Sequence, residues 1–318
     1  MNKHAIQAIV ISLVGLAIFA AGTARAEESL TGSQTAADGT VADKQKWSLR
    51  LPHDEHLTYH GIASFDEAGT GTGGMLYYAP SAAGLFASIL AHGLVSESAK
   101  MAQKNKLQAS ADNVLSAYQD ILKDFRYSEL MERAFTKVSP GFSVKLTDDT
   151  TTTEQDTLVD STPVFSLTPD QTAFIVDNAI VIHMSGNKSK ISYKKGIRVI
   201  SAAKNVTDPS AFWTANNGEK LKDESAQLVA ESLEIAFGDA TAQPDTNAAT
   251  YRTVRYREGA AEKIERAQLL SERCGRMLIR TLRGELMSVP ASNTAESSRD
   301  INNCAPLAES TKLNVSSR

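Results

Sequence analysis

Cysteine is scarce in this chain of 318 residues, which contains only Cys274 and Cys304. The two lie too far apart for the C-x-x-C spacing that is typical of a redox couple. Neither lies near the N-terminus, where a lipid-anchored protein would carry its modified cysteine. These absences argue against thiol chemistry and against a lipid anchor, and they favour a structural role for the pair.

Common catalytic and nucleotide-binding motifs are also missing. The chain has no G-x-S-x-G nucleophile elbow, no P-loop and no H-E-x-x-H zinc motif. The run Gly69–Gly74 formally satisfies G-x-G-x-x-G, but a dinucleotide site needs a helix to open at the last glycine. Residues 75–80 instead have an extended pattern. We therefore interpret the glycine run as a turn, and we expect no cofactor.

Long apolar runs are confined to the N-terminus. Lys3 precedes an apolar stretch over residues 5–21 that contains no Asp or Glu, and small residues then lead to Ala26. This is the pattern of a cleavable signal peptide. The stretch is shorter than the ~20 apolar residues that a transmembrane helix needs. We predict that residues 1–26 are removed, and that the mature chain is exported to the periplasm or beyond without spanning a membrane.

The charge balance is mildly acidic. The chain has 33 Lys and Arg against 37 Asp and Glu, so removal of Lys3 and Arg25 leaves 31 against 37, a net charge of −6. Such a chain is not attracted as a whole to nucleic acid or to an anionic membrane, although a local basic face could bind an anion. We expect no nucleic-acid partner.

Export places Cys274 and Cys304 in an oxidising compartment, where a lone pair of cysteines predicts one disulfide. The bridge would close a loop of about 30 residues, for which chain entropy gives roughly 3 to 4 kcal/mol of stabilisation. It would tie the C-terminal tail to the body of the protein.

The order of composition along the chain predicts a flexible leader over residues 27–49, one α+β domain over 50–290 and a tail over 291–318. An acidic, threonine-rich stretch at 148–161 is expected to be a loop. The domain is expected to have a central sheet, mostly antiparallel or mixed, on which a long helical region and a later helix pack.

Three helical segments carry recognisable patterns. Helix-forming residues run from Pro80 to Phe125 and again over 127–137. The first region ends in an apolar stripe of Val114, Tyr118, Ile121, Leu122 and Phe125. A later helix is expected to open at Asn216-Asn217-Gly218 and to end at Gly238 as a left-handed cap.

Strand patterns fill much of the second half of the chain. Residues 173–184 are apolar on both alternating faces, which predicts a strand covered on both sides, with 193–202 as its neighbour. Residues 251–256, 263–270 and 276–289 alternate as strands do, and Cys274-Gly275 supplies a turn between the last two. The predicted disulfide would therefore start from the tip of an antiparallel C-terminal β-hairpin.

Half of the six histidines, His53, His56 and His60, lie within eight residues. On a helix their imidazoles would share a face and could hold Zn²⁺. Pro52 and the β-favouring residues that follow instead favour an extended segment, which sends His53 and His56 to opposite faces. A solvated loop is thus the preferred interpretation, and a metal site is the alternative. The isolated His183 is expected to be a hydrogen-bonded, partly buried residue.

Basic residues gather in one predicted hairpin region: Lys188, Lys190, Lys194, Lys195, Arg198 and Lys204. The default interpretation is a solvated sheet face, and the functional alternative is a binding site for an anionic envelope polymer. Small residues recur every four positions within Pro80–Ser96, which favours a core helix and, as an alternative, a homo-oligomer contact.

Because no nucleophile, metal or phosphate motif stands out, we expect a non-enzymatic envelope protein that binds or scaffolds another envelope protein or an envelope polymer. The alternative is a periplasmic hydrolase of an envelope polymer, whose paired carboxylates sequence spacing does not reveal. A pocket with two carboxylates of perturbed pKa would favour the hydrolase, whereas an exposed apolar patch would favour binding.

Overall fold

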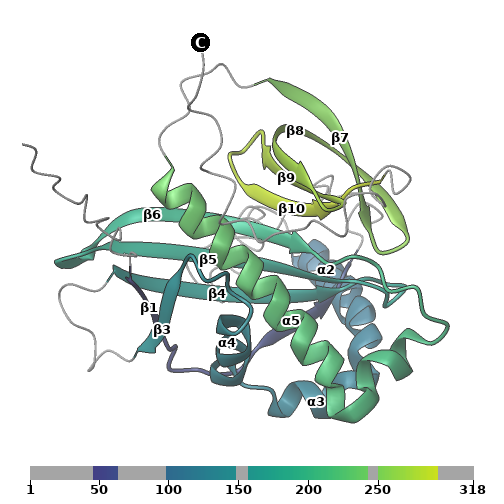
Figure 1. Ribbon diagram of the computed structural model, residues 1–318. Coiled ribbons are helices and arrows are strands. Elements are labelled where there is room, and N and C mark those ends of the chain that lie inside the picture. Colours follow the sequence, from purple (N-terminus) through teal and green to yellow (C-terminus); the bar gives the residue numbers. More distant parts are fainter. Residues whose placement is uncertain (1–45, 64–97, 148–156, 243–249, 293–318) are drawn as a thin grey trace, which may run out of the picture. The chain divides into compact units, whose positions relative to one another are not determined.

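The computed structural model describes residues 46–63, 98–147, 157–242 and 250–292. These residues form an α+β fold in which a mixed sheet of ten strands carries a few helices (Figure 1). The strands are β1 (Lys46–Arg50), β2 (Thr58–Gly61), β3 (Ser143–Thr147), β4 (Thr157–Leu167), β5 (Phe174–Met184), β6 (Asn187–Ile200), β7 (Tyr251–Glu258), β8 (Ala261–Arg273), β9 (Arg276–Thr281) and β10 (Leu286–Pro290). The helices are α2 (Ser98–Asp112), the 3₁₀ helix η2 (Asn113–Tyr118), α3 (Gln119–Asp124), α4 (Tyr127–Phe135) and α5 (Pro209–Thr241). The predicted fold class is confirmed at this level.

The strand order is β3-β1-β4-β5-β6-β10-β9-β8-β7, and β2 pairs with β4 away from this path. Parallel pairs join β1 to β3 and β4, β2 to β4, and β6 to β10, while the other pairs are antiparallel. β10 therefore connects the first part of the sheet to the strands that end it, because it pairs with β6 on one side and with β9 on the other.

Strand β5 is covered on both faces, as its sequence predicted. Phe174, Ile175 and Val176 follow one another and all are buried. Since successive strand residues point to opposite faces, cores lie on both sides of the sheet here. Phe174 and Val176 belong to a large core, and Ile175 belongs to a smaller one. The predicted neighbour is β6, which pairs with β5 in antiparallel register.

The large core lies between the sheet and helix α5, which runs across β5 and β6 (Figure 1). The Trp47 ring stacks on Phe237 of the helix, with ring centroids 4.3 Å apart. Trp213 packs edge-on against Phe174 at 5.0 Å, and its Nε1 donates to the Gln171 carbonyl at 2.8 Å. The indole nitrogen is thus satisfied inside an apolar environment.

The predicted apolar stripe also faces the large core, since Tyr118, Ile121 and Phe125 are buried. The long helical region is not one helix, however, because α2 passes into the 3₁₀ turn η2 before the short helix α3 begins. Helix α4 confirms the shorter helix predicted over 127–137. The small-residue segment Pro80–Ser96 lies outside the described residues, as do Gly69–Gly74 and the signal peptide.

Helix α5 corrects the predicted helix limits. It begins at Pro209, where the Asp208 carboxylate accepts a hydrogen bond of 2.9 Å from the Ala211 amide, and it ends at Thr241 rather than at Gly238. Asn216, Asn217 and Gly218 have φ of 52°, 56° and 77°, so the predicted start is a kink within the helix. Asn and Gly suit a kink as well as a helix start, but an Asp cap followed by proline is the stronger start signal.

The last four strands curl around the small core. Tyr256 of β7 forms an isolated bridge with Ala291, which lies just beyond β10. The last strand in the sheet order, β7, is therefore close to the end of β10, the first strand of this group. The small core consists of apolar side chains from the six strands β5 to β10: Ile175, Ile200, Val254, Tyr256, Ala267, Met277, Ile279, Met287 and Val289.

The predicted turn at Cys274-Gly275 joins β8 to β9, and both residues have positive φ, 54° and 68°. The single strand predicted over 276–289 is two strands, because Gly284 adopts a φ of 83° in a turn between β9 and β10. Cys304 lies outside the described residues, so the disulfide stays a prediction.

Two other boundaries differ from the predictions. β4 begins at Thr157, so the last part of the predicted loop 148–161 belongs to a strand in which Leu158 and Val159 are buried. The polar composition around them concealed this short apolar pair. β1 begins at Lys46, within the predicted leader 27–49. In the part of the chain described, no helix has the length and apolar character needed to cross a membrane.

Candidate functional site

The clustered histidines do not assemble as a metal site. His53 is exposed before β2, the His56 ring lies 2.9 Å from the Asp54 carboxylate, and His60 lies within β2 at 3.6 Å from Asp112. The segment is not helical, so its imidazoles do not share the face that a helix would give them. Within residues 46–63, 98–147, 157–242 and 250–292, no three His, Cys, Asp or Glu side chains are placed to hold a metal ion.

The basic residues predicted to form one face are divided by the pleat of β6. Lys195 points toward α5, where its Nζ lies 2.7 Å from Asp239. Arg198 points to the opposite face and makes hydrogen bonds of 2.7 and 2.8 Å with Asp177. Burial by itself would lower the pKa of Arg198, but the Asp177 carboxylate raises it. Lys195 and Arg198 are thus paired within the fold and lie on opposite faces of β6, whereas Lys190 and Lys194 are exposed. The polymer-binding site stays a prediction.

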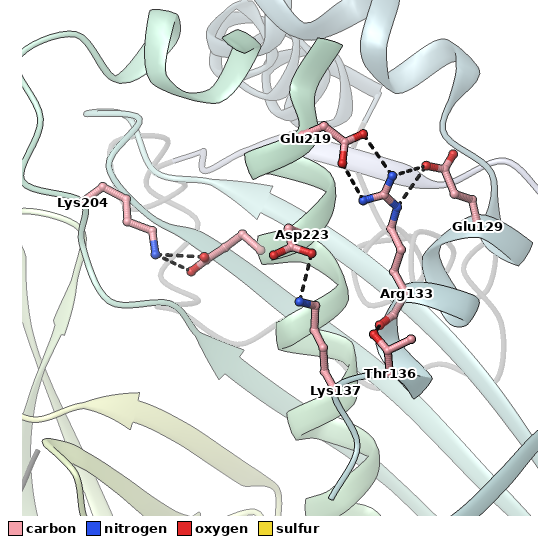
Figure 2. Close-up of polar contacts among 8 residues, drawn as sticks. Glu129, Arg133, Thr136, Lys137, Lys204, Glu219 and Asp223 are labelled. Atoms are coloured by element: carbon pink, nitrogen blue, oxygen red, sulfur yellow. Dashed lines mark hydrogen bonds and ion pairs between the residues drawn. The ribbon is translucent and has the colours of Figure 1, made fainter. Parts of the chain in front are cut away.

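Ion pairs also join helices α4 and α5. Figure 2 shows Arg133 between two carboxylates, 3.0 Å from Glu129 and 2.9 Å from Glu219. Lys137 lies 2.9 Å from Asp223 in the same view. The hydrogen bonds between Arg133 and Glu219 lower the pKa of the Glu219 carboxyl group and raise the pKa of the Arg133 guanidinium. Since Arg133 and Lys137 each have a carboxylate partner, we interpret these ion pairs as part of the packing of α4 against α5.

A third charged group lies on the sheet face away from α5. Val159 belongs to the large core, so its neighbour Asp160 points to the other face. The Asp160 oxygens accept two hydrogen bonds of 2.7 Å from Arg50, and His183 Nε2 lies 2.8 Å away. Burial alone would raise the pKa of Asp160, but the Arg50 and His183 hydrogen bonds lower it below 3.8. His183 is hydrogen-bonded and partly buried, as expected.

Besides Glu234 on α5, whose pKa is also raised by burial, Glu285 in the turn before β10 has the character of a general acid. Burial raises its pKa, and the charge of Asp177 raises it further. Asp177 is itself held by Arg198. A carboxyl group with a raised pKa beside a second carboxyl group is an arrangement that general acid catalysis uses.

The hairpin of β7 and β8, which we call the arginine hairpin (Tyr251–Arg273), differs from these paired groups. It contains six Arg or Lys residues and four Glu, a net charge of +2 in a chain with a formal net charge of −4. Its register places Arg255 opposite Ile264 and Thr253 opposite Arg266, so these four side chains share one face.

This face is exposed to solvent. The Arg255 side chain is 60% exposed, and Ile264 is 57% exposed. Arg255 pairs with Glu262 at 2.7 Å, but Glu262 is also 45% exposed, and an ion pair in water is weak. Arg266 is exposed and has no ion-pair partner among the residues that the structure describes. The face therefore combines cations that are open to a ligand with one exposed apolar side chain.

An open hollow of about 320 Å³ lies beside the first half of β7. Val254 and Met277, both of the small core, contribute its apolar lining. Arg252 and Glu272 also line it, and they are only loosely paired at 3.8 Å. The Ser292 hydroxyl, which has no hydrogen-bond partner within the described ranges, completes a mixed polar and apolar surface.

The sequence did not single out the arginine hairpin, because its basic residues are spaced more widely than those of residues 188–204. Ion pairing and solvent exposure of each side chain decide which cations can reach a ligand. A signal was present. Arg255 and Arg257 alternate with Val254 and Tyr256, which is the pattern of a half-buried strand with a cationic outer face.

Comparison with known proteins adds no assignment to this geometry. No protein family, no curated protein and no solved structure matches the chain.

Proposed function

We propose that this chain is an exported, non-enzymatic protein of a bacterial envelope that binds another envelope component through the arginine hairpin. Export is supported by the signal-peptide pattern of residues 1–26. The observation that carries the binding role is the exposed face of Arg255, Ile264 and Arg266, in contrast to the less exposed cations of the ion pairs on β6 and between α4 and α5.

The chemistry of this face suits a protein interface. Arginine is enriched at interfaces because its planar guanidinium can make several hydrogen bonds while it packs against apolar groups. Ile264 supplies an apolar side chain at the centre of the face, directly opposite Arg255. Leaving such a side chain in water forgoes the stabilisation of roughly 1.5–3 kcal/mol that its complete burial would provide.

Charge also favours one orientation of approach. The mature chain is expected to be acidic as a whole, so a partner with an acidic surface is repelled by most of the molecule and attracted by this hairpin. The predicted bridge from Cys274 to Cys304 would begin at the turn between β8 and β9. It would hold the C-terminal tail close to the same strands.

The proposal is tested by cross-linking in cells that produce the full chain. The double variant Arg255→Glu/Arg266→Glu reverses two charges on the face, and Lys106→Glu/Lys123→Glu reverses two exposed charges on helices as a matched control. We expect a discrete cross-linked complex with the natural chain and with the control, and its loss with the hairpin variant. A complex that survives in the hairpin variant, or the absence of any complex, would contradict the proposal.

A second candidate function, hydrolysis of an envelope polymer, is favoured by one observation, the raised pKa of Glu285 beside Asp177. Glu285 would act as the general acid in this case. Incubation of the mature chain with purified cell-wall polymer should then release new reducing or amino ends, and Glu285→Gln should abolish the release. Equal release by the variant, or none by the natural chain, would exclude this role for Glu285.

A further inference from the structure

We propose that the outer edge of β7 binds an acidic peptide segment in an extended conformation, which adds one strand to the sheet and places an apolar side chain in the hollow. This inference rests on the proposed function and names the partner class for the same hairpin. Its basis is the coincidence of a sheet edge, a side-chain hollow and two exposed arginines whose ion pairs are open to solvent.

β7 is suited to strand addition because it ends the strand order and is regular. It pairs with β8 over eight residues, from Tyr251 to Glu258, with no shift of register. On its other side the bridge of Tyr256 to Ala291 is the one pairing within the ranges that the structure describes. The backbone groups of residues 251–255 on that side can therefore pair with an incoming strand.

The hollow supplies a place for a side chain of that strand. It lies beside Thr253, Val254 and Arg255, so a chain paired with β7 passes over it. Its volume of about 320 Å³ is at the lower end of the ~300–1,000 Å³ range of ligand pockets, which suits a single side chain better than a large ligand. In strand addition the backbone provides affinity, and pockets for alternate side chains provide specificity.

Charge selects the kind of strand. Arg252 and Arg255 flank the hollow, and the Arg252 and Glu272 side chains are each 54% exposed. A second copy of this chain, added edge to edge through β7, would bring arginines against arginines, and like charges on neighbouring strands are destabilising. An acidic segment of another protein places carboxylates beside these guanidinium groups instead, which favours charge-assisted hydrogen bonds.

The inference is tested with a fluorescent seven-residue peptide that alternates glutamate with valine, titrated into the mature full-length chain and followed by anisotropy. We expect saturable binding that a lysine–valine peptide does not reproduce. Methylation of the amide nitrogens along one edge of the acidic peptide should weaken binding about tenfold, because it removes backbone hydrogen bonds to β7. Arg252→Glu/Arg255→Glu should weaken it by at least as much, and Lys106→Glu/Lys123→Glu should not.

Three results would overturn the inference: no saturable binding, equal binding of the N-methylated peptide, or equal binding of the lysine peptide. The N-methylated peptide is tested on the unchanged protein, so the comparison of the two peptides remains valid even if an arginine variant folds poorly. If these peptides fail while Arg255→Glu/Arg266→Glu still abolishes the cross-linked complex, strand addition is wrong and the binding role of the hairpin stands.

Discussion

Arg198 and Arg255 illustrate how the two parts of the sheet use the same residue differently. Arg198 lies on β6, is 13% exposed and makes two hydrogen bonds with Asp177. Arg255 lies on β7, is 60% exposed and pairs with Glu262, which is itself 45% exposed. Burial makes the first pair part of the folded structure, whereas the second cation can exchange its partner for a ligand. The buried ion pair on β5 and β6 should therefore respond to mutation through stability, and the arginine hairpin should respond through binding.

The largest expected effect is in the large core. Trp213 is fully buried, contacts Phe174 and donates to the Gln171 carbonyl. We expect Trp213→Ala to lower the free energy of unfolding by about 3–5 kcal/mol, through lost burial and the cavity left behind. Urea unfolding followed by circular dichroism measures this change. An unchanged midpoint would mean that the core under α5 does not dominate stability.

The arginine comparison is tested by truncating each residue in turn. Arg198→Ala leaves Asp177 without its partner in a largely buried site, so we expect a loss of about 3–5 kcal/mol. Arg255→Ala should change stability by no more than about 0.5 kcal/mol, as for most exposed positions. The two variants are matched in chemistry, so similar losses in urea unfolding would remove the distinction between the regions.

The predicted disulfide is a further test of the C-terminal strands. If Cys274 and Cys304 are bridged, reduction should lower stability by roughly 3 to 4 kcal/mol, because the unfolded chain regains the freedom of a loop of about 30 residues. Intact mass before and after reduction and alkylation shows whether the bridge exists. Two alkylated thiols without prior reduction would contradict it.

Asp160 provides a smaller, pH-dependent effect. Its pKa in the folded chain lies below 3.8, because the hydrogen bonds from Arg50 and His183 outweigh the opposite effect of burial. The ionised form therefore stabilises the fold above the unfolded pKa, and this contribution is lost as the pH falls through the lowered folded pKa. Asp160→Asn should be less stable than the natural chain at pH 6, with the difference shrinking toward pH 2. Parallel stability curves would contradict this role.

Periodicity predicted much of the fold, because burial of one or both faces of an element leaves a direct trace in the sequence. The two-sided strand β5 and the turn at Cys274-Gly275 were found in this way. Helix limits were less accurate, since Asn216-Asn217-Gly218 suits a kink as well as a start. The candidate site was missed because the sequence does not show which cations are paired. Arg198, for example, pairs with Asp177, which lies 21 residues earlier in the chain on the neighbouring strand.

The most direct test of binding through the arginine hairpin compares two exposed isoleucines on strands. Ile264 on the arginine hairpin is 57% exposed, and Ile191 on β6 is 50% exposed. A photo-activated cross-linking amino acid placed at either position in the full chain reports what lies beside it in the cell envelope. We expect a discrete adduct from position 264 and none from position 191. An adduct from 191 alone, or equal adducts from both, would contradict the assignment of binding to the arginine hairpin.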